Sequence, residues 1–299
     1  MTNTIFSNCV NDRQYKAATG LSLVEFNDLF AFFAPCYVPK QANPYYAEKA
    51  PLLTDKREAL FFILHYYKAY PTFQNMGLYF GMSNAAACQY VELLRPCLHA
   101  ALTGHQPAVK RLFTNQAEFD KLFEGVGAIF IDVTEIPIER ADNYDVQKLS
   151  FSGKKRFHTL KWLLICDCYK RILFASKAYD GRTHDFAIFK EIFAGLDFSQ
   201  FETHVDLGFL GLGKNVSGAH VFIPHKASKN HPLTAQQKEE NTELSRLRVV
   251  VENAIAKIKS FFIMRIENRM KIKHKLNDAF HICAALANFK SRSQFAGCQ

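Results

Sequence analysis

Hydrophobic positions follow a helical spacing in the first part of the chain and a strand-like spacing after residue 126. Turn and cap residues divide the first part: Thr54 and Ser83 can each cap a helix, Pro71 suits a first turn, and Pro96 stops or kinks a helix. This pattern predicts helices over residues 23–33, 55–69, 72–80, 84–95 and 116–123, with a loop or linker over 35–46.

From Gly127 onward, short apolar runs predict a strand, a hairpin, a helix, two short strands and two further helices. The predicted strands are 128–133, 158–167, 171–178, 203–206 and 219–223, and the predicted helices are 184–194, 244–259 and 275–290. This order is typical of an α/β fold with a mixed sheet. The strands 128–133 and 203–206 can lie side by side as inner strands.

Three acidic residues interrupt these apolar patterns: Asp132, Asp206 and Glu252. Their hydrophobic flanks place them at element ends or on inward faces, where an unpaired carboxylate is costly. A bound cation or a basic partner is the usual remedy. If the two strands are neighbours and the helix over 244–259 packs across them, the three carboxylates meet at one sheet edge. Such a set suits two Mg²⁺ or Mn²⁺ ions about 3.5–4 Å apart that act on a phosphate ester.

The net charge of +9 is uneven, because residues 1–126 carry +1 and the remainder carries +8. Seven of the basic residues fall between Lys257 and Lys275, a run that attracts polyanions. On its own this run is better explained as the solvated face of a helix with a basic tail. Together with the three carboxylates, it favours a nucleic-acid partner.

The predicted helices 72–80 and 84–95 are separated by Gly81, which is the pattern of a helix-turn-helix. The second helix would then place Asn84 and Gln89 toward bases, and both side chains can read adenine. A plain three-helix packing unit fits the same pattern, and the near-neutral charge of this region counts against strong DNA affinity.

Basic residues also flank the predicted sheet. Lys154, Lys155 and Arg156 lie in a Gly-containing turn that suits phosphate contact, or is simply a solvated hairpin end. Arg248 and Lys259 share the face of Glu252 and can bind phosphate or steady that carboxylate, although Arg248 and Glu252 also have the spacing of a surface ion pair. In the segment 181–185, Thr183 or Asp185 can cap the next helix, and Arg182 or His184 can support an active site.

The remaining composition points to a protein of the reduced cytoplasm. The eight cysteines form no CxxC pair and no zinc-type set of four, so we expect thiols. We also expect no signal peptide, and no apolar stretch is long enough to span a membrane.

Several segments together resemble the DDE-superfamily endonuclease transposases of bacterial insertion sequences, related to the PIF/Harbinger type. The matching segments are Ile131-Asp-Val-Thr-Glu-Ile136, Ser152-Gly-Lys-Lys-Arg-Phe-His-Thr-Leu-Lys161, Gly181-Arg-Thr-His-Asp-Phe186, Val205-Asp-Leu-Gly-Phe-Leu-Gly211, Ile223-Pro-His-Lys226, Lys238-Glu-Glu-Asn241 and 246–259. Tyr70-Pro-Thr-Phe-Gln74 and Tyr79-Phe-Gly-Met-Ser83 resemble the helix-turn-helix that such transposases carry.

The resemblance implies an RNase-H-like catalytic domain over 127–299, a helix-turn-helix domain with its connector over 51–126, and a partly helical segment over 1–50. It implies that Asp132, Asp206 and Glu252 hold the catalytic metals. It further implies recognition of terminal inverted repeats, strand transfer into target DNA, and a homodimer or larger assembly on DNA in the cytoplasm, associated with the nucleoid. The expected DNA-phosphate contacts are Lys154, Lys155, Arg156, Arg248, Lys257 and Lys259.

Three other functions remain open from the residues. A related endonuclease would cut DNA without integrating it. A domesticated DNA-binding protein could keep the three acidic residues without catalysis. A structural α/β protein could use them as caps, although three acidic positions on separate elements make that a weaker explanation.

Overall fold

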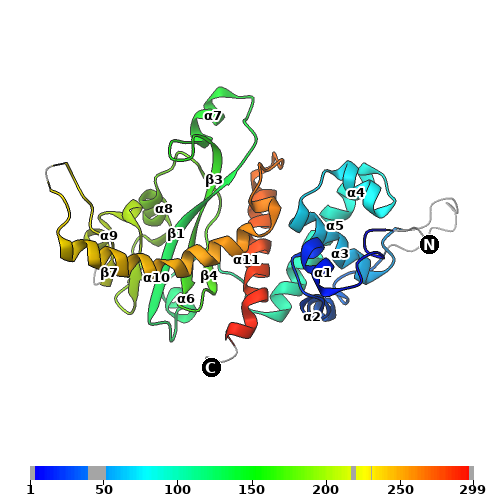
Figure 1. Cartoon of the computed structure of the whole chain (residues 1–299), viewed down its shortest axis with the longest axis horizontal. Helices are drawn as coiled ribbons and strands as arrows, with labels where there is room; N and C mark the ends of the chain where they lie inside the picture. Colours follow the sequence, from blue (N-terminus) through cyan, green and yellow to red (C-terminus); the bar gives the residue numbers. More distant parts are fainter. Residues whose placement is uncertain (1–3, 40–51, 217–219, 230, 296–299) are drawn as a thin grey trace. The chain divides into compact units, whose positions relative to one another are not determined.

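The structure, a computed structural model, describes residues 4–39, 52–216, 220–229 and 231–295 (Figure 1). The chain divides into two compact units. Unit 1 comprises residues 1–108, 259–265 and 285–290, and unit 2 comprises residues 109–258, 266–284 and 291–299. The boundaries predicted at residues 50 and 126 stay predictions. The predicted linker over 35–46 lies mostly outside the described residues.

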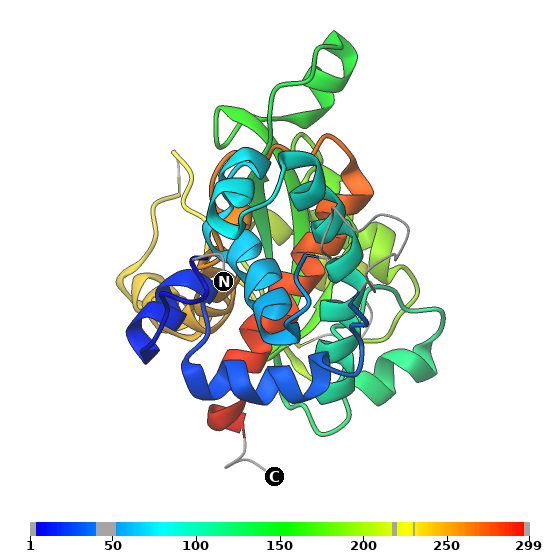
Figure 2. The same ribbon diagram turned by 90° about the vertical axis from the view of Figure 1, so that its right-hand side faces the viewer.

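Unit 1 is built from helices around a buried central helix, α3 (Figure 2). Its elements are α1 (Asp12–Thr19), α2 (Leu23–Phe33), α3 (Lys56–Ala69), α4 (Phe73–Phe80), α5 (Asn84–His105) and the 3₁₀ helix η2 (Phe262–Met264). The side chains from Ala59 to Leu64 are all fully buried, and α1 and α5 pack against this helix. The predicted helix over 23–33 is confirmed to the residue.

The helix boundaries in unit 1 correct three details of the sequence prediction. The helix predicted to stop or kink at Pro96 does not stop there but continues to His105. Leu94, Leu98 and Leu102 stay buried on both sides of the proline, and their burial outweighs its missing hydrogen bond. Asp55, rather than Thr54, caps α3. Pro71 precedes α4, which Thr72 caps, and Ser83 caps α5 as predicted.

Unit 2 contains a mixed sheet in which antiparallel and parallel strands meet at β1. Its strands are β1 (Ala128–Pro137), β2 (Phe151–Ser152), β3 (Phe157–Asp167), β4 (Ile172–Ala175), β5 (Tyr179–Asp180), β6 (Glu202–His204) and β7 (His220–Phe222). β3 pairs antiparallel with β1 and, along its other edge, with β2, β4 and β5. β6 and β7 continue the sheet as parallel strands. This topology confirms the predicted RNase-H-like mixed sheet and the adjacency of the two acidic strands.

Helices cover both faces of the sheet. On one face, Ile129, Ile131, Leu163 and Ile165 pack into a Phe-rich core with α6 (Gln116–Leu122) and α8 (Asp185–Phe193). The opposite face meets α10 (Ala235–Lys259) and the unit 2 part of α11 (Lys273–Phe295) (Figure 1). There Trp162 stacks on Phe280 with the ring centroids 4.5 Å apart.

Two helices of unit 2 differ from their prediction. The helix predicted from residue 244 begins at Ala235, and its buried positions are Val251, Ala254 and Ile258. Leu247, about one turn before Val251, is exposed. The cap of α8 is His184, whose Nδ1 accepts the backbone N–H of Phe186, so the prediction that Thr183 or Asp185 caps this helix is wrong.

Short elements account for the rest of unit 2. They are α7 (Tyr144–Ser150), η1 (Leu207–Phe209) and α9 (Leu212–Asn215). In Figures 1 and 2, α7 lies at the tip of a projection from the end of the sheet. Within the described part of the chain, no helix is both long and apolar enough to cross a bilayer.

Candidate active site

The strand register brings Asp132 and Asp206 to equivalent places on neighbouring strands. β1 and β6 run parallel, with Phe130 opposite His204. Asp132, within β1, and Asp206, just after the end of β6, each come two residues later. The parallel register therefore carries both toward the same end of these strands, and the charge of Asp206 acts on Asp132. The rings of Phe130 and His204 stack with their centroids 4.8 Å apart, and this contact fixes the pair of strands directly before the carboxylates.

The electrostatics of Asp132 reflect its acidic neighbour. Burial and the negative charge of Asp206 raise the pKa of Asp132 to about 6, although Arg248, a hydrogen bond from the Val133 N–H and the charge of Lys154 oppose this rise. Its side chain is only 18% exposed. A divalent cation bound between two partly buried carboxylates would neutralise their mutual repulsion.

Asp206 is oriented by its own loop. Its Oδ1 accepts the backbone N–H of Gly208 at 2.8 Å and so caps η1. A Cβ atom at Gly208 would lie 2.8 Å from Asp206 Oδ1 and 3.2 Å from Asp185 Oδ2. The absence of a side chain at residue 208 therefore lets a second carboxylate, that of Asp185, approach the loop of Asp206.

Arg248 connects α10 to this edge of the sheet. Its guanidinium lies 3.8 Å from Asp132 Oδ2, so the ion pair of Arg248 is made with Asp132 and the predicted surface pair with Glu252 is wrong. Glu252 lies one turn further along α10 and is exposed. Among the described residues, no three His, Cys, Asp or Glu side chains stand close enough to form a metal site. The role of Glu252 thus stays a prediction.

A buried lysine organises a network of acidic residues that the sequence analysis did not predict. Lys161 on β3 donates to Asp185 Oδ1 at 2.8 Å and to the Thr183 carbonyl at 2.9 Å. It also lies 3.9 Å from Glu135 Oε1, and Glu135 accepts a hydrogen bond from Thr159. Lys161 and Glu135 are opposite each other in the β1–β3 ladder. This network joins β1, β3 and the start of α8 beside the loop of Asp206.

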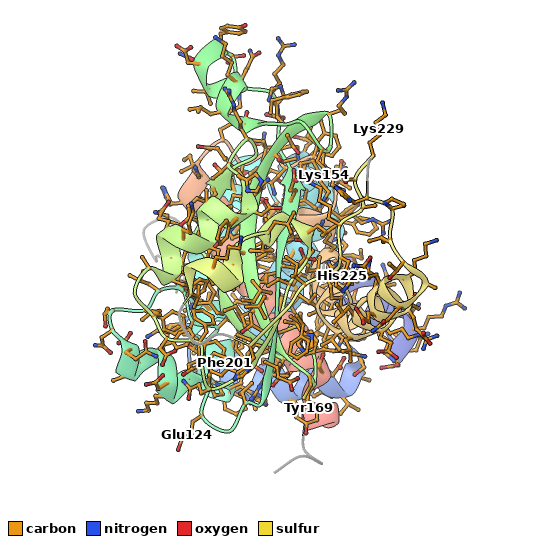
Figure 3. The ribbon with its side chains drawn as sticks, turned by 90° about the vertical axis from the view of Figure 1, so that its left-hand side faces the viewer. Glu124, Lys154, Tyr169, Phe201, His225 and Lys229 are labelled. Atoms are coloured by element: carbon orange, nitrogen blue, oxygen red, sulfur yellow. The ribbon has the colours of Figure 1, made fainter. Side chains whose placement is uncertain are left out.

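The basic turn between β2 and β3 lies near the paired carboxylates. Lys154, Lys155 and Arg156 are all exposed, and the charge of Lys154 acts on Asp132. Figure 3 places Lys154 toward the α7 end of the sheet, and Tyr169, in the β3–β4 turn, toward the other end. The three cations therefore lie where a phosphate backbone would approach the acidic edge.

The other predicted DNA contacts differ in their exposure. Asn84 and Gln89 lie exposed in the first turns of α5. Lys257 is partly buried and donates to Ser291 Oγ at 2.7 Å, which ties its ammonium to α11. Lys259 is partly buried and belongs to unit 1.

A mixed sheet that presents neighbouring carboxylates beside a basic turn is typical of enzymes that act on phosphodiesters. A family model described as DDE superfamily endonuclease matches residues 131–288, and one described as helix-turn-helix of DDE superfamily endonuclease matches residues 52–104. The latter confirms the predicted helix-turn-helix over a plain packing unit.

A probable transposase for insertion sequence element IS702 from Microchaete diplosiphon is 30% identical over 264 residues, which are 88% of each chain. No solved structure matches the chain. The chain belongs to the DDE superfamily of endonucleases, and this membership implies that it binds DNA.

Proposed function

We propose that the protein is an insertion-sequence transposase that hydrolyses a phosphodiester at each end of its element and joins the freed 3′-hydroxyl to target DNA. The observation that carries this proposal is the placement of Asp132 on β1 and Asp206 directly after β6, two residues beyond the parallel pair Phe130 and His204, where the charge of one carboxylate acts on the other. The relative from Microchaete diplosiphon, a probable transposase by its name, supports the same conclusion.

The residues present fit divalent metal ions. Carboxylate oxygens are the ligands that Mg²⁺ and Mn²⁺ prefer. Burial and, after it, the charge of Asp206 raise the pKa of Asp132, and a bound cation would offset both effects. We assign Asp132 and Asp206 as ligands, with Glu252 as the third carboxylate for two ions. When bound, these ions would activate the attacking hydroxyl group and stabilise the leaving oxygen.

The protein's own side chains position the DNA in this proposal. The exposed turn Lys154–Arg156 holds the phosphate backbone next to the carboxylates. In unit 1, α5 places Asn84 and Gln89 against bases of the terminal inverted repeat. A dimer or larger assembly in the cytoplasm would bring the two element ends together.

A second candidate is a DNA-binding relative that does not cleave. The exposure of Glu252 and the ion pair that Arg248 makes with Asp132 favour it, because a guanidinium already partly neutralises the first carboxylate.

The test is a cleavage and joining assay with labelled duplexes that carry the element's own ends. We expect Mg²⁺-dependent nicking and joined products from the wild-type protein and neither from Glu252→Gln. Nicking without joined products would reduce the function to that of an endonuclease. Binding without any nicking would favour the second candidate.

A further inference from the structure

An open cavity lies beside α7, away from the paired carboxylates. Its volume is about 580 Å³, within the range of roughly 300–1,000 Å³ that is usual for small-molecule sites. Its walls come from the loop between β1 and α7, from α7 itself, from the β2–β3 hairpin and from the loop before α8. The cavity thus belongs to the projection seen at the end of the sheet in Figure 1.

The lining of this cavity combines cations with aromatic rings. Arg140, Lys148 and Arg182 contribute positive charge, and the aromatic rings are those of Tyr144, Phe151 and His158. The lining contains no acidic residue. Guanidinium groups bind phosphate through paired hydrogen bonds, and aromatic faces stack with bases. The two groups together therefore match a nucleotide.

Local contacts fix the aromatic wall before any ligand binds. Phe151 on β2 is opposite His158 on β3, and their rings pack edge to face with centroids 5.6 Å apart. His158 Nδ1 is hydrogen-bonded to Ser150 Oγ at 3.0 Å. The cavity therefore needs little rearrangement to bind a flat ring, which lowers the entropy cost of binding.

The cationic wall is also held in place. Arg140 Nε donates to Gln147 Oε1 at 2.9 Å, and Gln147 Nε2 donates to the Ala141 carbonyl at 2.7 Å. The backbone N–H of Arg182 donates to the Leu149 carbonyl at 3.0 Å, which attaches the loop before α8 to α7. These contacts fix the Arg140 side chain and the backbone of Arg182 at the wall of one cavity.

Large aromatic area remains open to solvent at this site. Tyr144 is 66% exposed and Phe151 is 41% exposed. A second copy of the chain could cover such rings, but three cations without an acidic partner in the lining favour an anion that also carries a flat ring. The neighbouring turn with Lys154, Lys155 and Arg156 extends the same positive surface.

Since the proposed function makes DNA the substrate, we infer that this cavity holds an unpaired nucleotide of the DNA end. The base stacks on Tyr144 and Phe151, and its phosphate binds to Arg140 and Arg182. A base inside a duplex cannot reach such a cavity, so the nucleotide must be unstacked from its neighbours. The projection then selects frayed or single-stranded ends over continuous duplex.

The test compares the full chain on three fluorescent duplexes of one sequence: fully paired, with a three-adenine overhang, and with an abasic overhang of equal length. We expect wild-type protein to bind the adenine overhang at least about fivefold more tightly than the other two, from the stacking of one base. Tyr144→Ala combined with Phe151→Ala removes this preference and leaves binding to paired duplex unchanged.

Phe157→Ala is the matched control. Phe157 is 44% exposed in the same hairpin but pairs with Ser152, which places it on the opposite face from Phe151. Its removal leaves the preference intact. The inference is overturned if the double variant keeps the full preference, or if it changes only the oligomeric state in size-exclusion chromatography. In either case, paired-duplex binding and metal-dependent nicking would still support the proposed function. Loss of all DNA binding by wild-type protein would overturn both.

Discussion

Replacing Asp132 by Asn should make the metal-free protein more stable while abolishing its activity. The pKa of Asp132 rises from its usual 3.8 to about 6, and one pKa unit corresponds to about 1.4 kcal/mol. The ionised carboxylate therefore lowers the free energy of unfolding by up to about 3 kcal/mol at pH 7.5. Asn keeps an oxygen that can accept the Val133 N–H but leaves Arg248 without its carboxylate, so we expect a net gain of about 1–2 kcal/mol.

The pH dependence follows from the direction of this change. Below about pH 4 the carboxyl is protonated in both folded and unfolded chains, and the difference between wild type and variant disappears. Between about pH 4 and pH 6 the unfolded chain ionises first, so wild-type protein loses stability relative to the variant as the pH rises. Above about pH 6 the difference stays constant.

The assay is urea denaturation in EDTA, followed by circular dichroism at several pH values. Asp167→Asn is the control. The Asp167 side chain is even less exposed than that of Asp132, 4% against 18%, but it accepts bonds from the Tyr169 and Arg171 N–H groups and pairs with the Arg171 guanidinium. That variant should be less stable. Added Mg²⁺ should stabilise the wild type and not Asp132→Asn. If Asp132→Asn is no more stable than wild type at pH 7.5, the account of repelling carboxylates is wrong.

Three further changes test other parts of the structure. Lys161→Met leaves two carboxylates without their buried cation. It should lower the free energy of unfolding, measured by urea denaturation, by about 3–5 kcal/mol. An unchanged urea midpoint would show that the network does not stabilise the fold. Gly208→Ala forces a Cβ atom against Asp206 Oδ1 and should lower nicking by about 100-fold with little change in melting temperature; normal nicking would contradict the assigned position of Asp206. Asn84→Ala and Gln89→Ala should each weaken binding to the inverted repeat by about 1–3 kcal/mol and leave binding to a duplex of random sequence unchanged. Both affinities can be measured by fluorescence anisotropy. Equal losses on the two DNAs would mean that these residues do not read bases.

The sequence predicted secondary structure best where a single apolar run corresponds to a single strand. The runs before Asp132 and Asp206 predicted β1 and β6 as neighbours, and the parallel register confirms it. Strand ends were less predictable: β1 continues through Pro137, four residues beyond its predicted end, because polar Glu135 is buried against β3. Pro96 is a similar case, since tertiary packing of α5 overrides a local helix breaker.

The network around Lys161 could not be predicted because it depends on strand register. Glu135 and Lys161 are 26 positions apart in the chain and meet only when β1 and β3 pair in the observed register. Asp185 was interpreted as a cap, a role that His184 takes instead. α7 also escaped prediction, since its seven residues include several exposed apolar side chains and show no amphipathic pattern.

The central claim is that Asp132 and Asp206 share a divalent ion. The most direct measurement replaces Mg²⁺ by Fe²⁺ in the full chain, generates hydroxyl radicals with ascorbate and peroxide, and maps the backbone cuts by mass spectrometry. The account predicts cuts in β1 near residue 132 and in the loop near residue 206, suppressed by excess Mg²⁺ and lost in Asp206→Asn. Cuts elsewhere, or none that Mg²⁺ suppresses, would contradict it.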